Sequence, residues 1–184
     1  FVTDNPGELR TLEELCAQRG TRADVLLRVT PGVEAHTHAY IRTGQIDSKF
    51  GMAIETGAAD EGVRTALSCA HLELRGVHCH IGSQIFDMDA FAEAAEVMVR
   101  FMAHVRDAFG VTLTELNLGG GFGVRYTSED APRTSDECMA VLGPAVERAC
   151  ARYGLPLPRL IIEPGRSIVA PFGVTVYTVG GVKT

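Results

Sequence analysis

Short apolar runs alternate with longer amphipathic stretches along most of this chain. The apolar runs at residues 23–30, 72–80, 113–118 and 160–163 have the length and composition of buried strands. Between them, apolar residues recur every three or four positions, as they do on one face of a helix. Strands that alternate with helices favour a parallel sheet with right-handed crossovers. The pattern therefore predicts an α/β fold.

Capping residues and glycines mark where the helices begin and end. The four expected helices are bounded by Asp4 or Asn5 and Gly20, by residues 55 and 70, by Asp87 or Asp89 and Gly110, and by Ser135 and about Tyr153. Pro144 lies inside the last of them, so a kink or a break is expected there. Residues 173–182 are predicted to form a final, longer strand with no helix after it.

Polar groups follow the predicted strands at the points where they end. They lie in the loop after Thr30 and in residues 78–83, 119–123 and 163–166. This placement is typical of a (β/α)8 TIM barrel, whose sites lie at the C-terminal face of the strands. Such a barrel takes roughly 250 residues, so we expect a partial one. We assign residues 1–172 to a barrel domain that is incomplete on its N-terminal side, and residues 173–184 to a strand that leads toward a further β-domain.

Composition and charge argue against several classes of protein. The chain carries a formal net charge of -6 and has no run of basic residues, so nothing indicates binding to nucleic acid. It has no apolar stretch of about 18 residues and no signal-peptide pattern, which makes a cytoplasmic protein with no membrane partner the default expectation. The five cysteines are scattered without CxxC spacing, which favours reduced thiols over disulfides.

Two motifs at the predicted strand ends have both a structural and a functional interpretation. Gly119, Gly120 and Gly121 either form a bare tight turn or let a phosphate approach exposed backbone N–H groups. Glu163 and Arg166, in the sequence Glu-Pro-Gly-Arg, either form a buried ion pair or bind a ligand. In the second case the carboxylate would bond to a protonated ring nitrogen of a cofactor, while the arginine would contact an anion.

The histidines allow several interpretations. His78 and His80 share one face of a predicted strand, so they are either two metal ligands or include one imidazole that stacks on a flat ring. No later strand end offers a further His or Asp as a third ligand. His36 and His38 belong to a long polar loop over residues 33–50, which is either a surface loop or part of a mobile active site.

Taken together, these residues resemble the diaminopimelate decarboxylase family, within the alanine racemase-like (fold type III) group of pyridoxal phosphate enzymes. The matching segments are residues 36–44, 47–51, 76–85, 116–126, 163–170 and 173–177. Ornithine and arginine decarboxylases share the HxGS, glycine-loop and EPGR elements. The sequences HTHAYIRTG and SKFG point more to the diaminopimelate branch.

The resemblance implies a role for each matching residue. His80 and Glu163 are implied in catalysis, because His80 resembles the imidazole that stacks on the cofactor ring and Glu163 resembles the partner of the pyridine nitrogen. Arg166 also resembles the arginine that holds a substrate carboxylate, and Arg28 would support the stacked histidine or Glu163. The implied phosphate contacts are Ser83, Gly119, Gly120, Gly121, Gly165 and Arg166.

The chain departs from the family pattern at two points. The family's Schiff-base lysine belongs to an early strand, in a short Ala-Val-Lys-Ala-Asn-like motif, and neither Lys49 nor Lys183 matches it. The C-terminal β-domain, which would carry residues that serve the partner subunit's site, is also missing from this sequence. We therefore expect the chain to be the central part of an enzyme, and to be catalytically incomplete by itself.

The activity implied by the resemblance is pyridoxal phosphate-dependent decarboxylation of meso-2,6-diaminopimelate to L-lysine and CO2, the last step of lysine biosynthesis, in a cytoplasmic homodimer with shared active sites. Three alternatives stay open. The first is another fold type III decarboxylase, acting on ornithine, arginine or carboxynorspermidine. The second is a pyridoxal phosphate-binding module without catalytic activity, and the third is a metal-dependent barrel hydrolase that uses His78 and His80.

Overall fold

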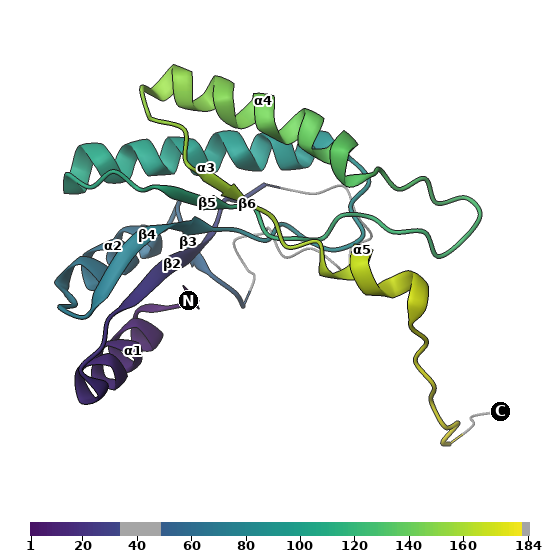
Figure 1. Ribbon diagram of the computed structural model, residues 1–184, viewed down its shortest axis with the longest axis horizontal. Coiled ribbons are helices and arrows are strands. Elements are labelled where there is room, and N and C mark those ends of the chain that lie inside the picture. The colour runs from purple at the N-terminus through teal and green to yellow at the C-terminus, as the bar shows by residue number, and fades with distance from the viewer. Residues whose placement is uncertain (34–48, 182–184) are drawn as a thin grey trace.

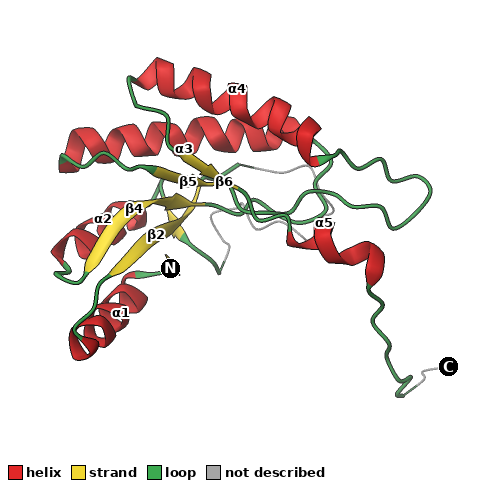
Figure 2. Ribbon diagram, in the orientation of Figure 1, coloured by secondary structure: helices red, strands yellow, loops and turns green. Residues whose placement is uncertain are grey.

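A computed structural model describes residues 1–33 and 49–181 and shows helices packed against a parallel sheet (Figures 1 and 2). The strands are β1 (Val2–Thr3), β2 (Ala23–Thr30), β3 (Met52–Ala53), β4 (Leu72–His78), β5 (Glu115–Asn117) and β6 (Arg159–Ile161). The helices are α1 (Pro6–Arg19), α2 (Ala58–Ser68), α3 (Met88–Phe109), α4 (Ser135–Tyr153) and α5 (Gly165–Val169), followed by the 3-10 helix η1 (Ala170–Phe172). The predicted α/β fold is confirmed.

The sheet is wound in the manner of a barrel. Its strands run in the order β1-β2-β4-β5-β6, with β3 paired to β2, and every pair is parallel. Along this main path, each later strand is added on the same side of the strand before it. In a doubly wound sheet, by contrast, the direction in which strands are added reverses. The described residues therefore form part of a (β/α)8 barrel, as the sequence predicted.

The helix boundaries follow from local chemistry. The Asn5 side chain accepts a hydrogen bond from the Glu8 N–H at 3.0 Å, which caps α1, and Asp87 caps α3 in the same way. Gly20 and Gly110 end these two helices in the left-handed conformation that favours glycine. All of these boundaries agree with the predicted ones.

Two predictions about α4 are corrected. Its N-cap is Thr134 rather than Ser135, and Thr134 forms a capping box with Glu137. The helix also continues past Pro144, so of the predicted kink or break the break is wrong, and the kink stays a prediction. Pro144 lies on the exposed face, where water can bond to the backbone carbonyl that the proline leaves without a donor.

The last part of the chain differs most from the prediction. Residues 165–169 form α5, which the pattern did not indicate, and the described residues 173–181 form no strand. A strand needs a partner edge for its N–H and C=O groups, and none of the described strands pairs with this segment. Figure 1 shows it extending away from the sheet. The proposed boundary at residue 172 stays a prediction.

The core lies between the sheet and the helices and is centred on α3. Phe91, Met98 and Leu116 are fully or almost fully buried, and α3 and α4 lie side by side over β5 (Figure 1). All five cysteines are free thiols, in agreement with the expectation of reduced cysteines. Burial raises the pKa of the Cys79 thiol to about 12, so this thiol has the properties of an apolar core residue.

Candidate active site

The ends of β4, β5 and β6 meet at one edge of the sheet. His78 is in register with Asn117, and Asn117 is in register with Ile161. The hydrogen bonds continue beyond the strands, because the Leu118 N–H donates to the Ile161 carbonyl at 3.0 Å and the Glu163 N–H donates to the Gly119 carbonyl at 2.8 Å. The loops after these strands therefore form one connected unit, with α5 beside it (Figure 2).

The glycines of this unit allow its loops to pack closely. A Cβ atom at Gly120 would overlap the carbonyl oxygen of Glu163, and one at Gly121 would overlap the carbonyl oxygen of Gly82. Gly121 also has a φ of +95°, which side chains rarely adopt. Contact between loops is thus a sufficient reason for glycine here, and phosphate binding at Gly119, Gly120 and Gly121 stays a prediction.

Glu163 lies beside two polar side chains from the neighbouring strands. Asn117 donates a hydrogen bond from Nδ2 to Oε1 of Glu163 at 2.8 Å, and His78 places its Nε2 3.7 Å from the same oxygen. The Glu163 side chain is 48% exposed, whereas His78 and Asn117 are buried. The carboxylate is therefore held from the interior of the sheet and remains accessible from outside.

Asn117 is a site residue that the sequence interpretation missed. Its Oδ1 accepts a hydrogen bond from the Gly119 N–H at 2.8 Å, so one amide joins the glycine loop to Glu163. The available signal was a polar residue near the end of an apolar strand, two positions before a glycine run. A buried amide at such a point needs partners for both of its ends.

The imidazoles of His78 and His80 are biased toward their neutral forms. Burial, the largest cause, together with the positive charge of Arg28, lowers the pKa of His78 to about 4, although the Glu163 carboxylate opposes this shift. Burial and Arg28 also lower the pKa of His80. Both rings are therefore neutral near pH 7.

Arg28 is held on the strand next to these histidines. It is in register with His78 across the β2–β4 pair. Its guanidinium lies 3.4 Å from the Asp4 carboxylate and 4.6 Å from the centre of the Phe50 ring. Arg28 thus has a partner of opposite charge in Asp4, and its position beside His78 agrees with the support toward the histidines that the resemblance implies.

His80 and Ser83 lie in the loop after β4. The Gly120 N–H lies 3.4 Å from Nδ1 of His80, so the imidazole is close to the glycine loop. Ser83 is half-buried in the same loop. The next residue, Gln84, was not predicted as a site residue, yet its amide makes two hydrogen bonds to the Val124 backbone at 2.7 and 3.0 Å. Gln84 thereby joins the two loops.

Arg166, in α5, is exposed and contacts Tyr126. Its Nη1 is 3.5 Å from the Tyr126 hydroxyl, and its guanidinium lies 6.0 Å from the centre of that ring. The structure thus supports neither a buried Glu163–Arg166 ion pair nor, by itself, a ligand for Arg166.

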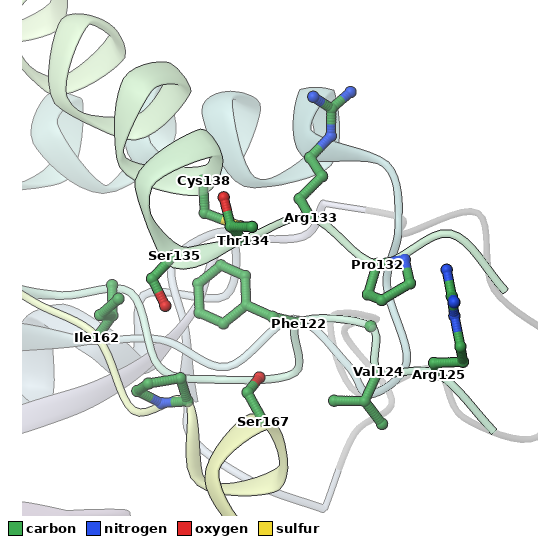
Figure 3. Close-up of a pocket in the computed structure, with 12 residues that line it drawn as sticks. Phe122, Val124, Arg125, Pro132, Arg133, Thr134, Ser135, Cys138, Ile162 and Ser167 are labelled. Carbon is green, nitrogen blue, oxygen red and sulfur yellow. The ribbon is translucent and has the colours of Figure 1, made fainter. Parts of the chain in front are cut away.

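A cavity of about 600 Å³ lies next to this unit, between the glycine loop, the first turn of α4 and α5. Figure 3 shows Phe122 at its centre, with Ser135 and Cys138 on one side and Ser167 on the other. The residues that line it are Phe122, Gly123, Val124, Arg125, Pro132, Arg133, Thr134, Ser135, Cys138, Ile162, Pro164 and Ser167. His80 and Glu163 are not among them, so the cavity adjoins the polar groups without containing them.

The remaining predicted groups give no further site. The segment with His36 and His38 lies outside the described residues, as does Lys183. The Lys49 ammonium lies 5.0 Å from the centre of the Phe50 ring. Within residues 1–33 and 49–181, no three His, Cys, Asp or Glu side chains gather as metal ligands, and no helix is both long and apolar enough to span a membrane.

Comparison with known proteins places these observations in a family. Residues 1–170 match the family described as "Pyridoxal-dependent decarboxylase, pyridoxal binding domain". A diaminopimelate decarboxylase of Bacillus subtilis is 49% identical over 183 residues, which cover 100% of this chain and 42% of the relative. The chain thus spans about two-fifths of the length of this relative.

Solved structures lead to the same group of proteins. The diaminopimelate decarboxylase from m. jannaschii in co-complex with L-lysine superposes with a TM-score of 0.78 at 34% identity, over 92% of this chain and 38% of that one. The Helicobacter pylori enzyme complexed with L-lysine gives a TM-score of 0.77 at 34% identity, over 92% of this chain and 40% of that one. The sequence match and the fold agree, and the chain belongs to the pyridoxal-dependent decarboxylase family, in its pyridoxal-binding domain.

Proposed function

We propose that this chain forms part of the active site of a diaminopimelate decarboxylase, which converts meso-2,6-diaminopimelate to L-lysine and CO2. The observation that carries the proposal is the convergence of Glu163, His80 and the glycine loop where neighbouring strands end. The relatives that bear this name, and the solved structures that hold L-lysine, support this choice of substrate.

Pyridoxal phosphate is the cofactor of the family, and the residues at the strand ends fit its chemistry. Its ring nitrogen needs an acceptor for an N–H, and Oε2 of Glu163 receives no hydrogen bond from the described residues. Its ring needs a flat neighbour, which the neutral imidazole of His80 provides. The proposed phosphate contacts are Ser83, Gly119, Gly120, Gly121, Gly165 and Arg166.

When bound, the cofactor supplies an electron sink for the negative charge that remains on the α carbon after CO2 leaves. Glu163 would hold the proton on the ring nitrogen, and His80 would cover one face of the ring and exclude water. Arg166 would bind the phosphate or a substrate carboxylate. Neither Lys49 nor Lys183 matches the family's Schiff-base lysine, so we propose that these 184 residues alone bind the cofactor without turning over substrate.

A homodimer with shared active sites, a cytoplasmic location and a role in lysine biosynthesis belong to the same proposal. All three are implied by the resemblance to the diaminopimelate decarboxylases. Light scattering on the purified protein tests the first of them. A monomer at micromolar concentration in the presence of cofactor would contradict the dimer.

The decisive experiment uses a chimera in which these residues replace the 183 matching residues of the Bacillus subtilis enzyme. We expect release of CO2 and L-lysine from meso-diaminopimelate. In the Glu163→Gln chimera this rate should fall by roughly 10²–10³, as after loss of one preorganised electrostatic contact, while cofactor affinity should fall by no more than about tenfold, the value of one hydrogen bond to a charged group. Glu115→Gln is the matched control, because Glu115 lies at the start of β5, at the edge of the sheet opposite to the one where Glu163 lies. Wild-type-like turnover by Glu163→Gln would refute the assignment.

The same assay separates the alternatives. Faster turnover of ornithine, arginine or carboxynorspermidine would favour another decarboxylase of this fold type. Cofactor binding without turnover of any of them would favour the binding module. The hydrolase alternative needs at least three metal ligands that gather around His78 and His80, and no such group of His, Cys, Asp or Glu side chains occurs among the described residues.

A further inference from the structure

One hydrogen bond and one longer polar contact converge on a single oxygen of Glu163. The Asn117 amide donates to Oε1 at 2.8 Å, and Nε2 of His78 lies 3.7 Å from the same atom. None of the described residues donates to Oε2. The two oxygens are therefore inequivalent before any ligand binds, because one is engaged from within the sheet and the other is left for a ligand.

The position of the proton on His78 follows from its surroundings. Nδ1 is buried and has no hydrogen-bond partner among the described residues. A proton on Nδ1 would leave a buried N–H without an acceptor and would turn the Nε2 lone pair toward the carboxylate, and both arrangements are unfavourable. The geometry therefore favours the tautomer in which Nε2 carries the proton and faces Glu163.

The charge state of His78 also matters for Glu163. A charged imidazolium would form an ion pair with the carboxylate and would compete with a ligand for its negative charge. The charged and titratable groups that act on His78 are Glu163, Arg28 and His80. Burial and the positive charge of Arg28 outweigh Glu163, so the ring stays a neutral donor.

We propose that His78 is a positioning residue for Glu163. The Asn117 amide holds Oε1 by a hydrogen bond, the Nε2–H of His78 stabilises the negative charge at that atom from 3.7 Å, and Oε2 is thereby left to face the ring N–H of pyridoxal phosphate. This inference rests on the proposed function, since it assigns the supporting contact of the carboxylate that binds the ring nitrogen.

The first test needs no cofactor. Nitrogen-15 NMR of the imidazoles in the full 184-residue chain at pH 7, with His78→Gln to identify the signal, should show a neutral His78 that is protonated on Nε2. Its Nε2 signal should move in Glu163→Gln. A charged ring, or a proton on Nδ1, would overturn the proposal.

The second test compares pyridoxal phosphate with its 1-deaza analogue, in which carbon replaces the ring nitrogen. We expect the wild-type chain to prefer pyridoxal phosphate by about tenfold, the value of one hydrogen bond to a charged group. His78→Ala should lose most of this preference and His78→Gln should keep it, because the glutamine amide supplies an N–H. His104→Ala, which removes an exposed imidazole on α3, is the control.

The outcomes separate the two proposals. An equal loss of affinity for both ligands in His78→Ala would indicate a merely structural role and would overturn the inference. A wild-type chain that binds both ligands equally, or neither, would instead contradict the assignment of Glu163 in the proposed function, even if the NMR result holds.

Discussion

Two regions of the molecule are rich in apolar residues, yet they are packed in opposite ways. The first, the strand-end unit, is β5 with the loops that follow β4, β5 and β6, and the second, the C-terminal segment, is residues 165–181. Leu116 and Leu118 in the first region are almost completely buried. In the second, Phe172 is 89% exposed and Val174 and Val176 are exposed to a similar degree. Figure 1 shows the first region beneath α3 and α4 and the second extending away from them.

The difference lies in the partners available to the backbone. Around β5, strand pairing and the hydrogen bonds donated by the Leu118 and Glu163 N–H groups give the backbone N–H and C=O groups their partners. No described strand pairs with residues 173–181. An alternating apolar pattern therefore favours a strand, but the strand forms only where the edge of another strand is available for pairing.

The largest expected contrast comes from replacing one phenylalanine that packs on the loop after β5 and one that lies in the C-terminal segment. Phe91→Ala removes a ring that is 1% exposed and stacks on Phe122 at 4.6 Å between centroids, so it should lower the free energy of unfolding by about 3–5 kcal/mol. Phe172→Ala should change it by less than about 0.5 kcal/mol. Urea denaturation of the two variants measures both values. Similar losses would mean that the C-terminal segment packs in solution.

The second prediction concerns the pH dependence that the strand-end unit confers. The pKa of His78 is about 4 in the folded state and about 6.5 in the unfolded state. Between these values only the unfolded chain binds the proton, so this contribution to stability is present above pH 6.5 and is lost as the pH falls toward 4. The slope from one such proton is at most about 1.4 kcal/mol per pH unit.

His78→Gln should remove this part of the slope, which denaturation at several pH values between 4 and 7 would reveal. Phe172→Ala is the control, since it removes no titratable group. An unchanged slope in His78→Gln would show that the folded protein protonates His78 as easily as the unfolded chain does.

The smallest expected effect compares the starts of α4 and α5. Thr134→Ala removes the side-chain half of the capping box, which should cost about 1 kcal/mol of the free energy of unfolding. α5 has no side-chain cap and no buried residue, so Ser167→Ala should fall within about 0.5 kcal/mol of the wild type. Thermal unfolding resolves the two. A loss in Ser167→Ala as large as that in Thr134→Ala would show that α5 is anchored more firmly than its contacts indicate.

Residues that the structure brings together at the strand ends were indicated by the sequence where a motif is local, while their roles toward a cofactor stay a prediction. Glu163, His80 and the three glycines were found because each belongs to a short motif at a strand end, and the structure brings them together. Asn117 and Gln84 were missed, because an isolated amide in a sequence gives no sign of where its two ends will bond. Each lies 40 or more residues from a partner that it contacts.

The sequence by itself determined most of the strands and helices up to residue 163 and most of the helix caps. These properties depend on neighbours within a few residues, so they can be read along the chain. Tertiary structure decided which oxygen of Glu163 is engaged, that His78 is a neutral donor beside it, and that the C-terminal apolar segment stays exposed. Each of these depends on burial and on groups that only folding brings near, which is why a local pattern could not determine them.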